Sequence, residues 1–140
     1  MKQQAELTIK KICPEFDDWP DSWAMTSEDK PYGCELLNAL APFCQHLIAS
    51  GLTRKTIRRH MGYLWLLGGE LIEEINEREK SRGKPTMQLI MDNIDDEGGP
   101  YSRHFESEAE MRSFDATCRK FYKFFKQSSA DKAKNASENK

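Results

Sequence analysis

Apolar side chains recur at helical spacing in three segments of this chain, residues 35–50, 53–78 and 107–126. Steps of three and four positions place these side chains on one face of an α-helix and leave polar residues on the other face. The longest segment has its apolar seam at Ile57, Met61, Leu64, Gly68, Leu71 and Ile75. The pattern predicts an all-α fold, a single helical bundle of about four to six helices.

Residues that begin or end helices stand between these segments. Gly51 supplies the left-handed conformation that ends many helices, and Thr53 is placed to cap the next one. Ser107 and Glu110 have the spacing of a capping box at the start of the third segment. Residues 35–79 are therefore expected to form two helices joined by a short turn, similar to a helix-turn-helix.

The helical pattern is less regular in two places. Gly68 and Gly69 interrupt the longest segment at a cost of about 1 kcal/mol each relative to alanine. They either let another helix approach closely or divide the segment into two helices. Residues 14–34 are rich in helix breakers and acids, so this stretch is expected to be irregular, with Trp19 and Trp23 anchoring it to the core.

Composition and pattern together set the extent of the folded domain. With 38% hydrophobic and 31% charged residues, the chain has the composition of an ordinary soluble protein. Residues 1–126 are expected to form one domain, in which residues 107–126 are the cleanest amphipathic helix. Residues 127–140 contain no apolar residue larger than alanine, so this tail is expected to be disordered.

The sequence shows no segment with the apolar length of a signal peptide or a membrane span, so we expect a cytoplasmic protein that does not bind membranes. Its cysteines form no C-x-x-C pair, which favours buried free thiols over a disulfide framework. They are Cys13, Cys34, Cys44 and Cys118. Cys44 and His46 alone do not make a set of zinc ligands, and no metal ion or cofactor is expected.

Charge is strongly segregated along the chain, although the formal net charge is only −2. Residues 51–69 contain four Lys and Arg side chains and no acid, whereas residues 70–79 contain five glutamates and one arginine. The four cations are Arg54, Lys55, Arg58 and Arg59. Cations at the start of a helix, next to its unpaired backbone N–H groups, suit the phosphates of a nucleic acid.

A set of apolar, glycine and threonine residues in this region has a recognisable spacing. The set is Phe43, Leu47, Gly51, Leu52, Thr53, Thr56, Ile57, Leu64 and Leu67. It resembles the N-terminal core-binding, or SAM-like, domain of tyrosine recombinases and phage integrases over residues 43–67. That resemblance implies a helical bundle that grips duplex DNA by its backbone, with the four cations in the matching place. Residues 56–70 and 114–122 also resemble a group of small bacterial proteins, a likeness that implies no function.

We therefore expect a non-enzymatic DNA-binding protein, and an accessory role in a mobile element follows from the integrase resemblance. Arg119 and Lys123 of the third segment are expected to add to the basic surface. The chain has no room for the catalytic domain of a recombinase, and no nucleophile, paired carboxylates or phosphate-binding glycine loop is recognisable in it. No cleavage activity is expected.

Three other interpretations remain open at this stage. The four cations are equally typical of the solvated side of an amphipathic helix. The acidic stretch 70–79 and the aromatic stretch Phe114–Phe125, with Tyr122 and Phe124 beside its apolar face, favour a module that binds a protein partner or a second copy. An unfamiliar enzyme would need a pocket that joins residues 103–104 to the acids of 92–97.

Overall fold

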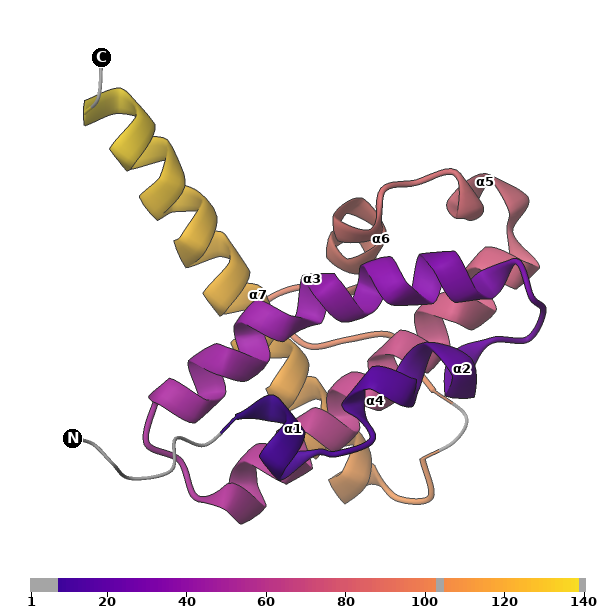
Figure 1. Ribbon diagram of the computed structural model, residues 1–140, viewed down its shortest axis with the longest axis horizontal. Helices are drawn as coiled ribbons and strands as arrows, with labels where there is room; N and C mark the ends of the chain where they lie inside the picture. Colours follow the sequence, from indigo (N-terminus) through magenta and orange to yellow (C-terminus); the bar gives the residue numbers. More distant parts are fainter. Residues whose placement is uncertain (1–7, 103–104, 139–140) are drawn as a thin grey trace. The chain divides into compact units, whose positions relative to one another are not determined.

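The computed structural model describes residues 8–102 and 105–138, with side chains up to residue 128, and these residues form an all-helical fold (Figure 1). The helices are α1 (Ile9–Ile12), the 3-10 helix η1 (Phe16–Asp18), α2 (Trp19–Trp23), α3 (Asp29–Ala49), α4 (Arg54–Glu77), α5 (Glu79–Arg82), α6 (Thr86–Asn93) and α7 (Glu108–Glu138). The predicted all-α fold is confirmed. The described part has more α-helices than expected because α2 and α5, with five and four residues, are too short to show a periodic pattern.

The chain divides into two compact units, Met1–Ile90 and Met91–Lys140, where the sequence predicts one domain over 1–126. The division falls inside α6, so the first unit contains α1 to α5 and the start of α6, and the second contains α7. Apolar periodicity identifies the helices but not which of them pack together, and this explains the difference.

Helices α3 and α4 form the centre of the first unit. Gly51, with φ of +80°, ends α3, and the Thr53 hydroxyl accepts the Thr56 N–H at 3.1 Å to begin α4. Both predicted helix boundaries, the end at Gly51 and the cap at Thr53, are confirmed, and α4 has nearly the predicted bounds. The apolar residues of the predicted α4 seam are at most 1% exposed: Ile57, Met61, Leu64, Leu71 and Ile75.

Helix α2 packs against α4 at Gly68. A Cβ atom built on Gly68 would lie 2.1 Å from Cζ2 of Trp23, which is far inside van der Waals contact. The Trp23 indole N–H donates to the Trp65 carbonyl at 2.9 Å, so the buried ring has its polar atom satisfied. Of the two alternatives for Gly68 and Gly69, close approach is therefore correct, and α4 continues without a break.

Residues 14–34 are more ordered than the sequence predicts. The anchoring role of Trp19 and Trp23 is confirmed, since they are 4% and 5% exposed. However, Trp19–Trp23 is a helix, and α3 begins at Asp29 rather than Glu35. Pro20 lies in the first turn of α2, where no intrahelical partner is needed for a backbone N–H, so a breaker residue is compatible with the helix.

In the second unit, the loop after α6 packs on α7. Phe114, Cys118 and Phe121 form the buried face of α7. The predicted cap is confirmed, since the Ser107 hydroxyl accepts the Glu110 N–H at 3.1 Å. The Gly99 N–H donates to Asp115 Oδ1 at 3.0 Å, and a Cβ on Gly99 would lie 2.5 Å from Cys118 Sγ. Glycine at position 99 thus lets the loop backbone contact the helix.

The sequence predicts that residues 127–140 are disordered. In the structure, however, the α7 backbone is helical through Glu138. The sequence after Gln127 contains no glycine or proline to end a helix. It also contains no large apolar side chain, so this part of α7 depends on local backbone hydrogen bonds rather than on a buried face.

Two glycines of α4 provide a matched pair of substitutions. A Cβ on Gly62 meets nothing within 4 Å, whereas a Cβ on Gly68 meets the Trp23 ring. Gly62→Ala should stabilise the protein by about 1 kcal/mol through helix propensity, and Gly68→Ala should destabilise it by about 2 kcal/mol through overpacking. Urea unfolding followed by tryptophan fluorescence measures both, since all three tryptophans lie in the first unit. Equal effects of the two substitutions would contradict the Trp23–Gly68 contact.

Candidate functional site

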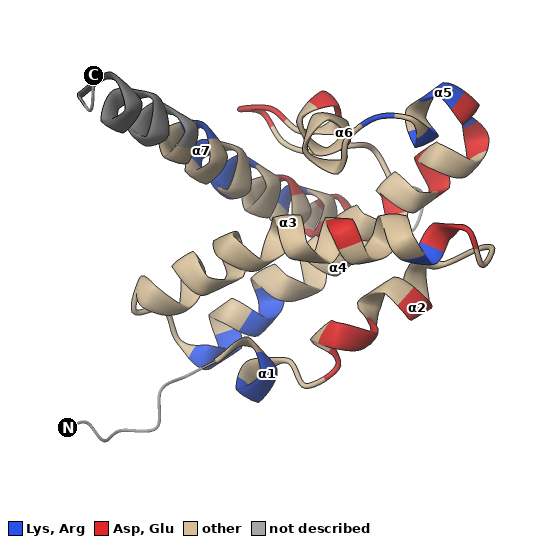
Figure 2. Cartoon of the chain, turned by 45° about the horizontal axis from the view of Figure 1, so that its top comes forward, with Lys and Arg blue, Asp and Glu red and all other residues tan. Residues whose placement is uncertain are grey.

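The four predicted cations lie together and exposed on the first turns of α4, at the same end of the first unit as α1 (Figure 2). The Arg54 guanidinium donates to the Lys11 carbonyl, and the Arg58 guanidinium donates to the Ile12 carbonyl. These bonds place the lysines of α1 beside the cations of α4. We call the combined set the basic surface: Lys10, Lys11, Arg54, Lys55, Arg58 and Arg59.

Arg54 and Arg58 therefore have a structural role that the sequence does not reveal. The carbonyls of Lys11 and Ile12 are among the last of α1 and have no partner within that helix. The two guanidinium groups satisfy them and hold α1 on α4. Lys55 and Arg59, in contrast, are exposed, and their side chains form no hydrogen bond or ion pair with another described residue.

Two acids partly offset the charge of the basic surface. Lys10 Nζ lies 3.0 Å from Asp17, and Arg58 Nη2 lies 3.9 Å from Glu15. All four side chains are about half exposed or more, so each pair is screened by water and contributes little to stability. The basic surface therefore stays positive overall.

Arg119 and Lys123 belong to the second unit, where both are exposed on α7. Arg119 donates to the Glu97 carbonyl at 3.3 Å and so contacts the loop that precedes its own helix. Lys123 has no such contact among the described residues. The prediction that these two cations extend the basic surface stays a prediction.

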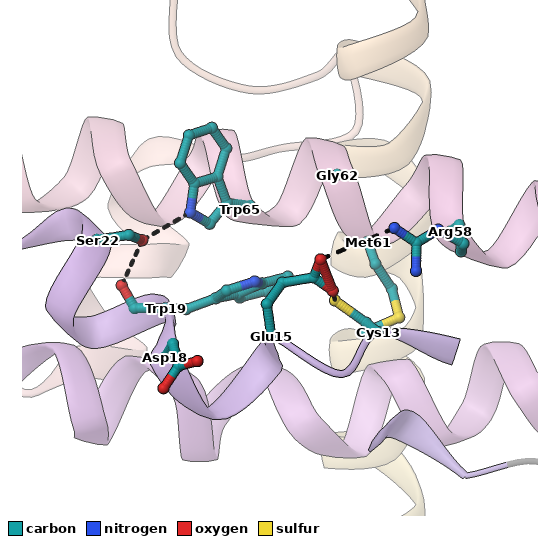
Figure 3. A pocket seen from close by; sticks show the side chains of 9 residues that line it. All are labelled: Cys13, Glu15, Asp18, Trp19, Ser22, Arg58, Met61, Gly62 and Trp65. Atoms are coloured by element: carbon teal, nitrogen blue, oxygen red, sulfur yellow. Dashed lines mark hydrogen bonds and ion pairs between the residues drawn. The ribbon is translucent and has the colours of Figure 1, made fainter. Parts of the chain in front are cut away.

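A groove between the η1–α2 segment and α4 is a feature that the sequence did not predict (Figure 3). It has a volume of about 340 Å³, and its apolar lining comes from Trp19, Met61, Gly62 and Trp65. Trp65 is 39% exposed, so its ring is available at the surface. The one signal in the sequence is that Trp65 lies off the apolar seam of its helix.

Hydrogen bonds fix the tryptophans of this groove. The Trp65 indole N–H donates to the Ser22 hydroxyl at 2.9 Å, and that hydroxyl donates to the Trp19 carbonyl at 2.7 Å (Figure 3). The Trp65 carbonyl is the acceptor of the Trp23 indole. The aromatic lining is therefore formed before any ligand enters.

The polar edge of the groove comes from Cys13, Glu15, Asp18, Ser22 and Arg58. The Cys13 thiol donates to Glu15 Oε1 at 2.9 Å. That hydrogen bond, followed by one from the backbone N–H of Glu15, lowers the pKa of the Glu15 carboxyl and keeps it ionised. Burial, together with the Glu15 carboxylate, raises the pKa of Cys13 to about 12, so this thiol is protonated and is a poor nucleophile.

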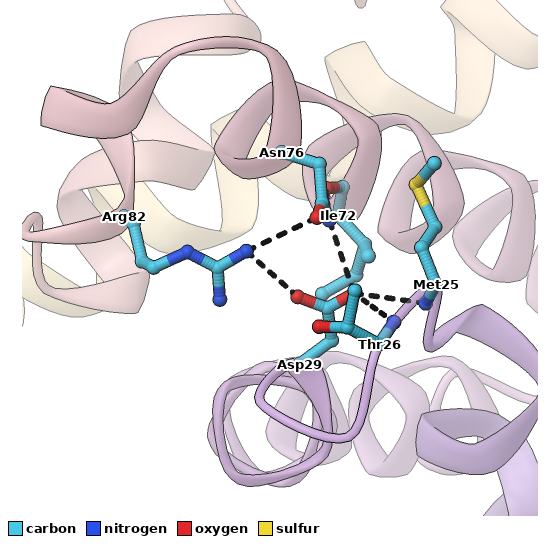
Figure 4. Close-up of polar contacts among 6 residues, drawn as sticks. All are labelled: Met25, Thr26, Asp29, Ile72, Asn76 and Arg82. Atoms are coloured by element: carbon cyan, nitrogen blue, oxygen red, sulfur yellow. Dashed lines mark hydrogen bonds and ion pairs between the residues drawn. The ribbon is translucent and has the colours of Figure 1, made fainter.

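A buried carboxylate, Asp29, lies at the other end of α4 (Figure 4). Its Oδ2 accepts the backbone N–H groups of Met25 and Thr26 and the Asn76 amide at 2.8–3.0 Å, and its Oδ1 lies 2.9 Å from Arg82 Nη2. Burial alone raises the pKa of Asp29, but these hydrogen bonds outweigh burial and lower it below the ordinary value. A fully satisfied carboxylate of this kind joins α3, α4 and α5 and offers no open position to a ligand.

The remaining chemical candidates do not assemble into a site. The described residues contain no group of three or more side chains that would hold a metal ion. Cys44 is buried and His46 is exposed, so they face different surroundings. Residues 103 and 104, needed for the enzyme interpretation, lie outside the described part.

None of the described helices has the length and apolar content needed to span a membrane.

Comparison of the chain with protein-family models, characterised proteins and solved structures finds no match.

Replacing Asp29 should weaken the first unit in a pH-dependent way. Because folding lowers the pKa of Asp29, its contribution is complete above the unfolded carboxyl pKa of about 3.9 and is lost as the pH falls through the folded value. Asp29→Asn should cost about 3 kcal/mol at pH 7, since it leaves the Arg82 guanidinium without a carboxylate partner, and less at pH 3. Urea unfolding at both pH values measures this difference. The exposed Asp21, paired with Lys30, provides the control Asp21→Asn, which should change stability by less than about 1 kcal/mol.

The four thiols should differ sharply in reactivity. Cys34 is exposed, while Cys13, Cys44 and Cys118 are buried and their pKa values are raised by burial. Titration with a chromogenic disulfide reagent at pH 8 should therefore give one fast-reacting thiol in the folded protein and four after denaturation. Cys34→Ser should abolish the fast reaction. Fast labelling that persists in this variant would show that a buried cysteine is accessible.

Proposed function

We propose that this protein binds the phosphate backbone of duplex DNA through the basic surface, without catalysing a reaction on it. The observation that supports the proposal most is the pair of hydrogen bonds from Arg54 and Arg58 to the carbonyls of α1. They bring the cations of two segments more than 40 residues apart onto one surface. A clustered set of this kind suits several phosphates at once.

Local geometry favours an anion at this surface. The first turn of α4 has unpaired backbone N–H groups, and it contains no acidic residue. Lys55 and Arg59 project from this region without a described partner, so they are free to contact phosphate. A hydrogen bond to a neutral carbonyl leaves the charge of Arg54 and Arg58 unchanged, and both therefore still attract anions.

We expect the bound polyanion to be duplex DNA because residues 43–67 resemble the core-binding domain of integrases. The same resemblance is the basis for extending the proposal to an accessory role in a mobile element. Binding of this type reads the backbone, so affinity should depend weakly on base sequence.

A module that binds a protein partner, or a second copy, through α7 is the second candidate. Tyr122, Phe124 and Phe125 are half-buried, so part of each ring stays accessible beside the buried face of that helix. Light scattering across a range of concentrations tests self-association directly. A monomer at all concentrations would limit this candidate to a different protein partner.

Fluorescence anisotropy with labelled duplex DNA at several salt concentrations tests the DNA proposal. The wild-type protein should show a linear fall of log affinity with log salt, by about 0.9 per phosphate contacted. Lys55→Glu/Arg59→Glu should weaken binding about tenfold or more and flatten the salt dependence by about two contacts. These two positions are chosen because Arg54 and Arg58 also hold α1, and their replacement would confuse binding with folding.

The control is Lys30→Glu/Lys80→Glu, which makes the same change in net charge at exposed positions outside the basic surface. It should bind DNA nearly as well as the wild type. Equal losses in the two variants would show that only net charge matters, and absence of wild-type binding near 50 mM salt would reject the proposal.

A further inference from the structure

We propose that the groove between η1–α2 and α4 is a binding site for a small organic cation, an ammonium group attached to an apolar body about the size of one aromatic ring. The inference rests on the shape, lining and charge of the groove. It does not depend on DNA binding, although Arg58 borders both surfaces.

The groove has the size and lining of a small-molecule site. Its volume of about 340 Å³ falls within the range of ligand pockets, which are mostly apolar with a few polar groups. Trp19 and Met61 line its buried part, and the half-exposed Trp65 lines its opening. Gly62 keeps the wall beside Trp65 open, because nothing lies within 4 Å of the position of its missing Cβ.

The aromatic walls are held in place before binding. Ser22 joins the Trp65 indole to the Trp19 carbonyl through two hydrogen bonds (Figure 3). Trp19 also packs edge-on against Phe16 with ring centroids 4.7 Å apart. A ligand therefore does not have to order these side chains, which removes part of the entropic cost of binding. Preformed indole faces are also the side chains that attract cations most strongly.

Charge selects the ligand. The groove is bordered by the Glu15 carboxylate and the Arg58 guanidinium, while the Asp18 carboxylate points away from it (Figure 3). Glu15 Oε2 is 3.9 Å from Arg58 Nη2, longer than a hydrogen bond, so this oxygen can accept a donor from a ligand. An ammonium group can donate to it while the apolar body packs on Trp65. A carboxylate ligand at this position would instead meet the like charge of Glu15.

Three ligands of one shape and different charge test the proposal by isothermal titration calorimetry at low salt. They are 2-phenylethylammonium, the neutral 2-phenylethanol and the anion phenylacetate. The ammonium ion should bind about tenfold or more tightly than the alcohol, and the anion should bind more weakly still. Raising the salt concentration should weaken only the binding of the ammonium ion.

Two variants locate the site. Glu15→Gln should reduce the affinity for the ammonium ion about tenfold and leave that for the alcohol unchanged, since only the charge is removed. Gly62→Leu should fill the groove and abolish binding of both, while the thermal unfolding midpoint stays at or above that of the wild type because leucine favours the helix. The control is Asp21→Asn, an exposed carboxylate of α2 that does not line the groove, and it should leave all affinities unchanged.

Any of three results with the wild-type protein would overturn the inference. One is equal affinity for the three ligands, another is tightest binding of phenylacetate, and the third is absence of binding of the ammonium ion at millimolar concentration. Unchanged binding in a folded Gly62→Leu variant would place the site elsewhere and would also overturn it. Because the DNA experiment uses Lys55 and Arg59, its outcome stays separate from this one.

Discussion

The contact between the Trp23 ring and the bare backbone of Gly68 determines the arrangement of the first unit. It brings α2 against α4 at a distance that no other residue at position 68 permits, and the indole N–H is satisfied by the Trp65 carbonyl. A second close approach packs the same short helix against α3, since a Cβ built on Gly33 would lie 3.2 Å from Pro20. Five residues of α2 are thereby positioned by two glycines on two different helices. A helix this short would not be stable in water without such packing.

The groove is a consequence of the same contact. Trp19 and Ser22 lie on α2, so their position opposite α4 depends on the packing of Trp23 against Gly68. Trp65 takes part in both features: its carbonyl accepts the Trp23 N–H, and its ring, bonded to Ser22, lines the groove. A partly exposed tryptophan is ordinarily a loss of buried apolar area. Here the backbone of the residue stabilises the fold while its side chain remains available to a ligand.

The sequence predicts the elements of this fold better than their contacts. Local signals, such as the apolar seam of α4, the left-handed Gly51 and the hydroxyl caps Thr53 and Ser107, are sufficient to place the long helices. The features that they miss involve distant pairs, since Trp23 and Trp65 are 42 residues apart and Asp29 and Arg82 are 53 apart. A glycine in a helix shows that something approaches closely, but the identity of the neighbour depends on tertiary packing. The groove is missed for the same reason, because its walls come from separate helices.

Charge in the sequence likewise does not reveal how each charged group is used. Arg82 forms an ion pair with the buried Asp29, so its charge is neutralised by a carboxylate inside the fold. Arg54 and Arg58 also make intramolecular hydrogen bonds, but their acceptors are neutral carbonyls, so both groups keep their full charge at the surface. A guanidinium has five N–H donors, and one bond to a carbonyl leaves others for an anion. Of the six cations of the basic surface, Lys10 lies near Asp17 and Arg58 near Glu15, while the side chains of Lys55 and Arg59 are exposed. The structural use of these arginines is therefore compatible with phosphate binding, and it is what gathers the cations onto one surface.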